Sequence, residues 1–180
     1  MSTDLSYSFL RKSDLFRYEG KSSDITRMLK YFRKCQTTSN PLLLILWRYL
    51  FKREKDKRAI EIYGKSNIGH GLYLGHAFGI TINSEVVIGS NCNIHKGVTI
   101  GQENRGLRKG VPTIGDCVWI GVNATIVGRI TIGDDVLIAP NSFVNCDVPS
   151  HSIVYGNPCI IKHRENATEG YINHRWKFER

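Results

Sequence analysis

An aliphatic residue recurs at every sixth position of this chain from Ile62 onward. The series has three runs, separated by a two-residue slip and by a longer interruption: Ile62, Ile68, Leu74 and Ile80; Ile82, Ile88, Ile94 and Ile100; Ile114, Ile120, Ile126, Ile132, Ile138 and Val144. A small or β-branched residue precedes most of them by two positions, and Gly often follows directly. This period fits neither an α-helix nor a simple alternating strand. It predicts short strands joined by tight turns.

Three such units make one triangular coil, in which the aliphatic side chains point inward and stack on the next coil at the usual inter-strand spacing of about 4.8 Å. Gly, Asn and Asp at the corners supply the backbone freedom that the turns need. The run is long enough for at least four stacked coils, so a continuous core can form. A β-sandwich of short strands would not keep its register over so many units.

The region from Ile62 to Pro158 resembles the hexapeptide-repeat acyltransferases. Within that family it is most similar to serine acetyltransferases and to their shorter relatives in polysaccharide gene clusters. The segment IGHGLYLGHAFGI, residues 68–80, resembles the family stretch IGxGIxLDHATGI. The resemblance implies a mostly β fold, a left-handed parallel β-helix, and acetyl-CoA as the acyl donor. The handedness follows from the resemblance alone, because periodicity does not report it.

The chain divides into three parts in this interpretation. Residues 1–58 form a small helical segment and linker, in which Ser23 to Lys52 carries apolar residues at helical spacing around a break at Thr37 to Pro41. Residues 59–161 form the β-helix, with an excursion loop at 102–112, and residues 162–180 form a C-terminal tail. The helical part is interpreted as an amphipathic cap on the first coil, with a membrane-surface helix as the alternative.

Charge and cysteine content limit the possible partners. The formal net charge is +9, but the basic residues concentrate before Glu61 and after Lys162, which is not the footprint of a nucleic-acid groove. A solvated basic face and a patch for anionic partners both remain open. The five cysteines show no disulfide or zinc spacing, so we expect no metal and a reducing, cytoplasmic location.

The longest apolar run is too short to cross a membrane. It extends from Pro41 to Phe51 and contains Arg48, whereas a spanning helix needs about 20 apolar residues. We therefore expect membrane contact to be peripheral at most.

His76 occupies the position of the histidine that acts as general base in the family. An acceptor hydroxyl needs a base to take its proton as it attacks a thioester, and imidazole is suited to this near neutral pH. The family also places an aspartate fifteen residues earlier, where this chain has Glu61. We therefore expect a catalytic Glu61–His76 pair. The aspartate that directly precedes the family histidine is replaced here by Gly75.

Other candidate residues are assigned to substrate and donor. His95 falls one coil after His76 and could face the same groove, and the loop carries Arg105 and Arg108 as candidate acceptor contacts. For the donor, the resemblance points to small residues along the later coils and to a basic residue after the final turn. These donor candidates are Gly121, Ala124, Ala139 and Lys162.

The resemblance implies an acetyl-CoA-dependent O-acetyltransferase that works as a homotrimer, with its sites between subunits. Serine acetyltransferases carry an Arg-His pair before the loop proline, and here Gly110 and Val111 take those positions. We therefore expect the acceptor to be a sugar hydroxyl of a surface polysaccharide. The main alternative is serine O-acetylation. An amino-sugar N-acetyltransferase, a carrier-protein-dependent acyltransferase and a non-catalytic β-helix scaffold are weaker alternatives.

Overall fold

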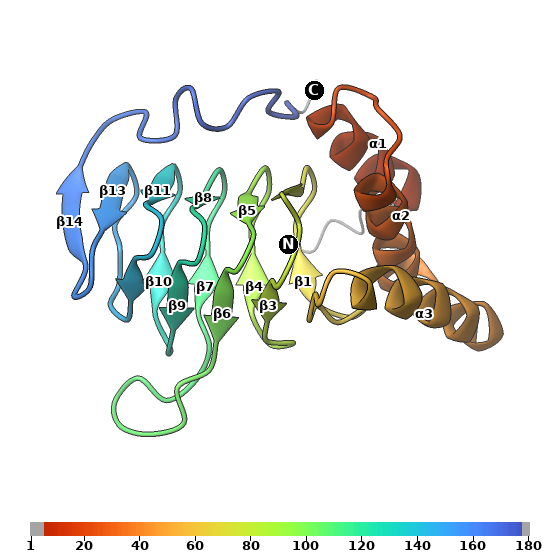
Figure 1. The fold of residues 1–180 in the computed structure, drawn as a ribbon, viewed down its shortest axis with the longest axis horizontal. Helices are drawn as coiled ribbons and strands as arrows, with labels where there is room; N and C mark the ends of the chain where they lie inside the picture. The colour runs from red at the N-terminus through yellow and green to blue at the C-terminus, as the bar shows by residue number, and fades with distance from the viewer. Residues whose placement is uncertain (1–5, 178–180) are drawn as a thin grey trace.

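The computed structural model describes residues 6–177. They form a helical cap, a stack of short strands, and a C-terminal segment that returns toward the cap (Figure 1). The helices are α1 (Tyr7–Arg17), α2 (Asp24–Thr37) and α3 (Pro41–Asp56). The strands are β1 (Asn67–Ile68), β2 (Tyr73–Gly75), β3 (Thr81–Ile82), β4 (Val87–Ile88), β5 (Asn93–His95), β6 (Thr99–Gly101), β7 (Thr113–Ile114), β8 (Trp119–Ile120), β9 (Thr125–Val127), β10 (Thr131–Ile132), β11 (Val136–Ile138), β12 (Phe143–Val144), β13 (Ser152–Tyr155) and β14 (Ile160–His163).

The strands form three sheets, one for each side of the coil. The β1 sheet has the order β1-β4-β7-β10 and the β3 sheet has the order β3-β6-β9-β12, and the β2 sheet runs β2-β5-β8-β11-β13-β14. Neighbouring strands are parallel, except that β14 pairs antiparallel with β13. The parallel solenoid predicted from the six-residue period is therefore confirmed.

The aliphatic residue of each repeat faces the inside of the coil. Along the β3 sheet, Ile82 pairs with Ile100, Ile100 with Ile126, and Ile126 with Val144, and all four are fully buried. Burial of each such side chain is worth about 1.5–3 kcal/mol. The inward column is thus the main source of stability for the strand stack.

The interruption in the repeat leaves the stack as a loop between β6 and β7 (Figure 1). At its base, the amide of Glu103 donates to the carbonyl of Gly110 at 2.9 Å, and the amide of Gly110 donates back at the same distance. These two bonds close the loop while the coil resumes at β7.

Helices α2 and α3 begin at conventional caps. Ser23 accepts a hydrogen bond from the amide of Thr26, whose hydroxyl in turn accepts from the Ser23 amide. Asn40 caps α3 in front of Pro41, which suits the first helical position. Helix α3 continues to Asp56, so the expectation of a linker from Lys52 onward is corrected.

Helix α1 was not expected from the sequence, because its buried face includes the polar residues Asp14 and Arg17. A fully buried ion pair explains why the polar residue Asp14 lies on this buried face. The guanidinium of Arg33 in α2 donates to both carboxylate oxygens of Asp14, at 2.7 and 2.9 Å. Arg33 also donates to the carbonyls of Ile68 and Gly69 in the first coil. One pair therefore joins both helices to the solenoid.

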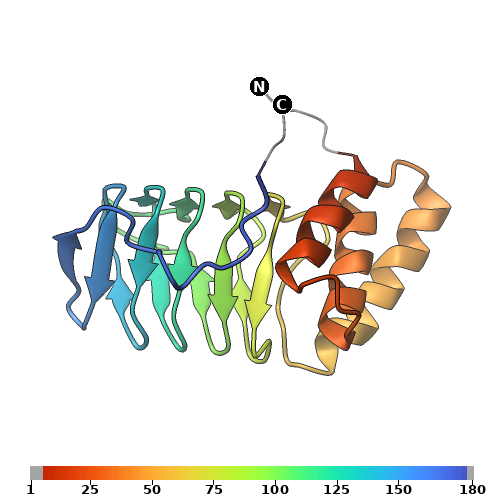
Figure 2. The same ribbon diagram turned by 90° about the horizontal axis from the view of Figure 1, so that it is seen from above.

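The segment after β14 crosses the outer face of the β2 sheet and ends beside α1 (Figure 2). The carboxylate of Asp135 accepts hydrogen bonds from the amides of Ala167 and Thr168. Nearer the cap, Asn91 accepts from the amide of Trp176 at 2.8 Å. Residues 164–177 are therefore held as a strap without forming helix or strand. Within residues 6–177, no helix is long and apolar enough to cross a membrane.

Candidate active site

His76 lies at the corner between β2 and β3, directly after Gly75. Gly75 pairs with His95 and Thr81 pairs with Thr99, so this corner is two residues longer than the corresponding one in the next coil. The φ angle of His76 is +50°, in the left-handed region, and its side chain is exposed. The two-residue slip in the repeat thus produces a wider corner that presents the imidazole to solvent.

Glu61 lies on the first coil, where it bridges to Thr81 at the start of the β3 sheet. Its side chain is exposed. Among residues 6–177, no hydrogen bond or ion pair joins Glu61 to His76. The structure therefore places the two residues on neighbouring coils without forming the expected pair.

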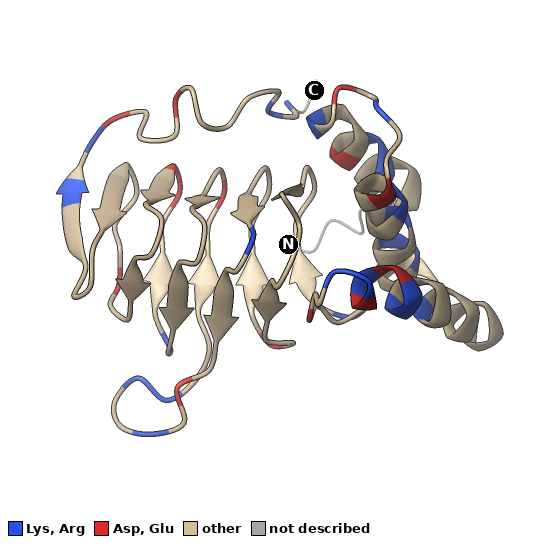
Figure 3. Cartoon of the chain, viewed as in Figure 1, with Lys and Arg blue, Asp and Glu red and all other residues tan. Residues whose placement is uncertain are grey.

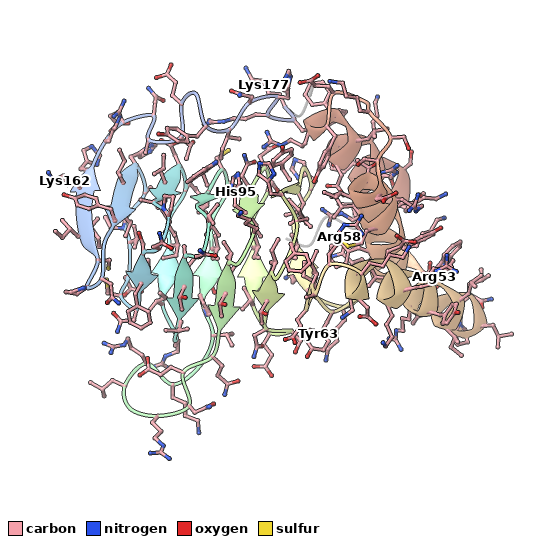
Figure 4. All side chains as sticks on the ribbon, in the orientation of Figure 1. Arg53, Arg58, Tyr63, His95, Lys162 and Lys177 are labelled. Atoms are coloured by element: carbon pink, nitrogen blue, oxygen red, sulfur yellow. The ribbon has the colours of Figure 1, made fainter. Side chains whose placement is uncertain are left out.

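His95 ends β5 and lies beside Gly75 (Figure 4). Its Nδ1 is 2.9 Å from the carbonyl oxygen of Ile120. A carbonyl only accepts, so Nδ1 carries the proton and Nε2 keeps its lone pair. The ring also contacts Trp119, with 4.6 Å between ring centroids. Burial lowers the pKa of His95, and the nearby His76 lowers it further, although the bond to Ile120 opposes this shift.

The absence of a side chain at Gly75 makes this arrangement possible. A Cβ atom at this position would lie 2.4 Å from Cδ2 of His95 and 2.6 Å from Nε2. Real Cβ atoms do not approach so closely, so the imidazole fills the space that an aspartate would occupy in the family motif. Sequence analysis treated Gly75 and His95 separately. The register of β2 against β5 brings the two residues together.

A cavity of about 490 Å³ adjoins His95 on the outer face of the β2 sheet. Its wall combines strand residues, the end of α1 and the strap, including Tyr73, Trp119, Arg17, Tyr171 and Asn173. Sequence analysis missed these residues because they come from distant parts of the chain and form no motif. His76 is not among the residues that line the cavity.

Arg17 is a buried cation in the wall of this cavity, with 4% of its surface exposed. It donates to the carbonyl of Asn173 at 2.5 Å and to the side-chain oxygen of Asn93. Within the described part of the chain it has no acidic partner, and its Nε has no hydrogen-bond partner. Burial accordingly lowers the pKa of Arg17. The cavity wall therefore carries the Arg17 cation, whereas the carboxylate of Glu19 in the same wall pairs with Lys21 and His174.

The candidate loop residues lie away from His76. The loop follows β6 and His76 precedes β3. The loop and His76 therefore lie at opposite ends of the strands of the β3 sheet. Arg108 pairs weakly with Glu103, at 3.4 Å, whereas Arg105 is exposed and has no ion pair among residues 6–177. In Figure 3 the loop that extends below the strands has blue Lys and Arg segments. The structure thus does not bring Arg105 or Arg108 to His76 of the same chain.

The candidate donor residues lie along the later coils, but they do not all face outward. Ala124 is fully buried in the core, so its side chain cannot line an external groove, and this expectation is corrected. Gly121 lies so close to the next coil that a Cβ there would be 2.6 Å from the nitrogen of Pro140. Ala139 is half-buried, and Lys162 is exposed on β14, where its Nζ is 5.7 Å from the Tyr155 ring centroid (Figure 4).

Comparison with known proteins agrees with the repeat pattern. A family profile described as bacterial transferase hexapeptide (six repeats) matches residues 112–146. Serine acetyltransferase 2 of Arabidopsis thaliana is 40% identical over 102 residues, which are 57% of this chain and 32% of that protein. Over these residues the chain is similar to the hexapeptide-repeat transferases. It spans less than two thirds of the length of the curated relatives that it matches.

Solved structures of this family give the same picture over more of the chain. Serine acetyltransferase of Neisseria gonorrhoeae in complex with serine is 27% identical, with a TM-score of 0.66, covering 87% of this chain and 69% of that one. A serine acetyltransferase in complex with CoA is 28% identical, also with a TM-score of 0.66, covering 78% of this chain and 57% of that one. The similarity therefore extends beyond the residues that the family profile matches.

These findings correct the expected acceptor. The sequence argument favoured a sugar hydroxyl of a surface polysaccharide, because Gly110 and Val111 replace the Arg-His pair of serine acetyltransferases. The relatives and solved structures just described are serine acetyltransferases and support the alternative acceptor instead. The loop argument gave most weight to the two replaced positions, although Arg105 and Arg108 leave the loop with other positive charges.

The lowered pKa of His95 predicts how stability depends on pH. An unfolded histidine titrates near 6.5, and the folded protein holds His95 neutral to a lower pH. The unfolded chain therefore binds more protons below about pH 6.5, so the free energy of unfolding should fall as the pH drops through that value. Urea unfolding of the parent and of His95→Gln at several pH values measures this. The variant should lose part of the decrease below pH 6.5, and an unchanged profile would contradict the prediction.

Proposed function

We propose that this protein transfers an acetyl group from acetyl-CoA to the hydroxyl of L-serine, with His76 as the general base. The carrying observation is the similarity to serine acetyltransferases, including structures with bound serine and with bound CoA, over most of this chain. The exposed corner at His76 supports the assignment, because a base must be accessible to both substrates.

The chemistry requires a single proton shuttle. His76 takes the hydroxyl proton as the serine oxygen forms a bond to the thioester carbonyl carbon. The tetrahedral intermediate then collapses, the carbon–sulfur bond breaks, and the imidazolium returns the proton to the CoA sulfur. The products are O-acetylserine and CoA, and the histidine is restored without a covalent enzyme intermediate.

Neighbouring groups are assigned supporting roles. Glu61 orients the imidazole and stabilises its charge when the carboxylate turns toward it, as the third group does in hydrolase triads. His95, held neutral next to His76, leaves Nε2 free to accept a hydrogen bond from the acceptor. Arg105, which has no ion pair among residues 6–177, supplies positive charge for the serine carboxylate.

The donor is proposed to lie along the later coils of the stack. Gly121 and Ala139 leave room for an extended pantetheine arm, and Lys162 meets the phosphates of CoA. We also infer that the coils wind left-handed, as in the hexapeptide-repeat acyltransferases that the sequence resembles. These assignments rest on the family likeness and, for Lys162, on the exposure of its side chain.

A homotrimer would complete the site. The loop and His76 lie at opposite ends of the strands of the β3 sheet. They are about 20 Å apart if one side of the coil has six residues with a rise of ~3.3 Å each. The loop of one chain can therefore supply Arg105 more easily to the neighbouring chain than to its own His76. Three prisms packed in parallel around a threefold axis give each site one loop, consistent with closed cyclic symmetry.

The experiment is steady-state release of CoA thiol from acetyl-CoA with L-serine as acceptor. We expect saturable turnover, with a KM in the usual range of about 1 μM–1 mM. L-alanine is the matched control, because it has the same charges and lacks only the hydroxyl. Thiol release that is no faster with serine than with alanine would refute serine as the acceptor. Arg105→Ala should raise the KM for serine more than it lowers kcat.

A further inference from the structure

Helix α3 exposes an apolar face that nothing in residues 6–177 covers. Leu42 and Ile45 are 76% and 65% exposed, and three further large side chains on the same helix are also exposed. These are Leu43, Leu46 and Tyr49. Positions 42, 45, 46 and 49 follow helical spacing, so they share one face. An apolar patch of this kind on a soluble surface usually marks an interaction site.

The opposite side of α3 is the side that packs on the protein. Trp47 stacks on Tyr31 of α2, with ring centroids 6.2 Å apart, and Phe51 contacts Phe32 at 5.5 Å. The exposed face is therefore not needed to hold the cap together. In Figure 1 the N-terminal part of α3 extends away from the strand stack.

The net positive charge of the protein is concentrated in the same part of the chain. Residues 1–58 contain 14 Lys and Arg against 6 Asp and Glu, whereas residues 59–180 contain 11 against 10. On α3 itself, Arg48 and Arg53 are exposed and have no acidic partner within the described residues. Figure 3 shows in blue the Lys and Arg positions along the helices of the cap, and Figure 4 marks Arg53 on α3.

We propose that α3 docks the protein on an anionic lipid surface. The apolar residues Leu42, Ile45 and Leu46 enter the boundary between headgroups and acyl chains, while Arg48 and Arg53 meet lipid phosphates. Tyr49 suits this depth because its ring is apolar and its hydroxyl is polar. With sixteen residues, α3 is about 24 Å long and lies on the bilayer rather than crossing it.

Charge favours a membrane over a second copy of the chain as the partner. Two copies joined through α3 would bring two strongly basic caps together, and like charges in contact oppose association. Anionic lipids offer the opposite charge and apolar volume at one surface. The exposed apolar side chains and the exposed basic side chains of α3 thus both find suitable partners at an anionic lipid surface.

The test is sedimentation of the full chain with vesicles of phosphatidylcholine alone or mixed with phosphatidylglycerol. We expect binding to the anionic vesicles, weakened by salt, and little binding to the neutral ones. The double variant Leu42→Glu/Ile45→Glu should bind at least about tenfold more weakly. Leu107→Glu is the matched control, since Leu107 is 95% exposed on the excursion loop. This variant should bind vesicles like the parent.

Three results would overturn the proposal: no binding to anionic vesicles, equal binding to both vesicle types, or undiminished binding of the double variant. Sedimentation velocity of the parent and the double variant adds an independent readout. A smaller assembly for the variant, without vesicle binding by the parent, would assign the face to contacts between copies instead. Circular dichroism of the variant checks that the helix is retained. Vesicle binding is measured without substrates, so its outcome is separate from the proposed acetyl transfer.

Discussion

Replacing His76 with alanine should lower kcat by about 10²–10⁴-fold, the range found when a general base is lost. The fold should survive, because the side chain is exposed and makes no hydrogen bond to another described residue. Thiol release at saturating acetyl-CoA and L-serine gives the rate, and thermal unfolding should match that of the parent. The loss should appear in kcat rather than in the KM for either substrate, since the base acts in the transition state.

His163→Ala is the control for removal of an imidazole as such. His163 is exposed on β14, at the far end of the stack, and should keep a near-normal rate. Near-normal turnover by His76→Ala would remove it as the base. Glu61→Gln measures whether the carboxylate reaches His76 during catalysis. We expect a smaller loss than for His76→Ala, and no loss would leave Glu61 outside the mechanism.

The largest effect on stability is expected at the buried pair of Asp14 and Arg33. Both side chains are fully buried. Arg33→Met should lower the free energy of unfolding by about 3–5 kcal/mol, because the carboxylate of Asp14 would remain buried without its partner. The carbonyls of Ile68 and Gly69 would also lose a donor, so the cap should loosen from the first coil. Urea unfolding followed by circular dichroism measures the loss.

Two comparisons make the measurement specific. Lys21→Met removes a cation from an exposed pair with Glu19, where the Lys21 side chain is 76% exposed, and should lower the free energy of unfolding far less than Arg33→Met does. The double variant Asp14→Leu/Arg33→Met should be more stable than Arg33→Met alone, because it leaves no unpaired buried charge. A cost for Arg33→Met as small as that of Lys21→Met would show that the pair does not hold the cap.

The strand stack could be predicted from sequence, because its cause is local and repeated. Each coil needs an inward aliphatic residue at the same interval, so the requirement appears many times over between Ile62 and Val144. The excursion loop was visible for the same reason, as a gap in the period. Helices α2 and α3 were also predicted, apart from the end of α3 at Asp56, because apolar spacing and the break at Thr37 to Pro41 are local signals.

The corrected site assignments depended on which way a side chain points, and the repeat pattern does not report this direction. Ala124 is a small residue near a corner, and small residues serve equally well inside the coil and along a groove. Only its burial in the core separated these two possibilities. Glu61 has the expected distance from His76 in sequence, but the orientation of two exposed side chains on neighbouring coils depends on their surroundings.

By itself, the sequence determined the parallel solenoid and the position of the loop, whereas the exposed corner that carries His76 came from the structure. The tertiary structure alone decided that His95 fills the space beside Gly75, that residues 164–177 cross the β2 sheet, and that Asp14 and Arg33 join the cap to the first coil. The physical reason is the range of the contacts. A repeat records one local demand many times, whereas each of these contacts joins distant residues once and leaves no period in the sequence.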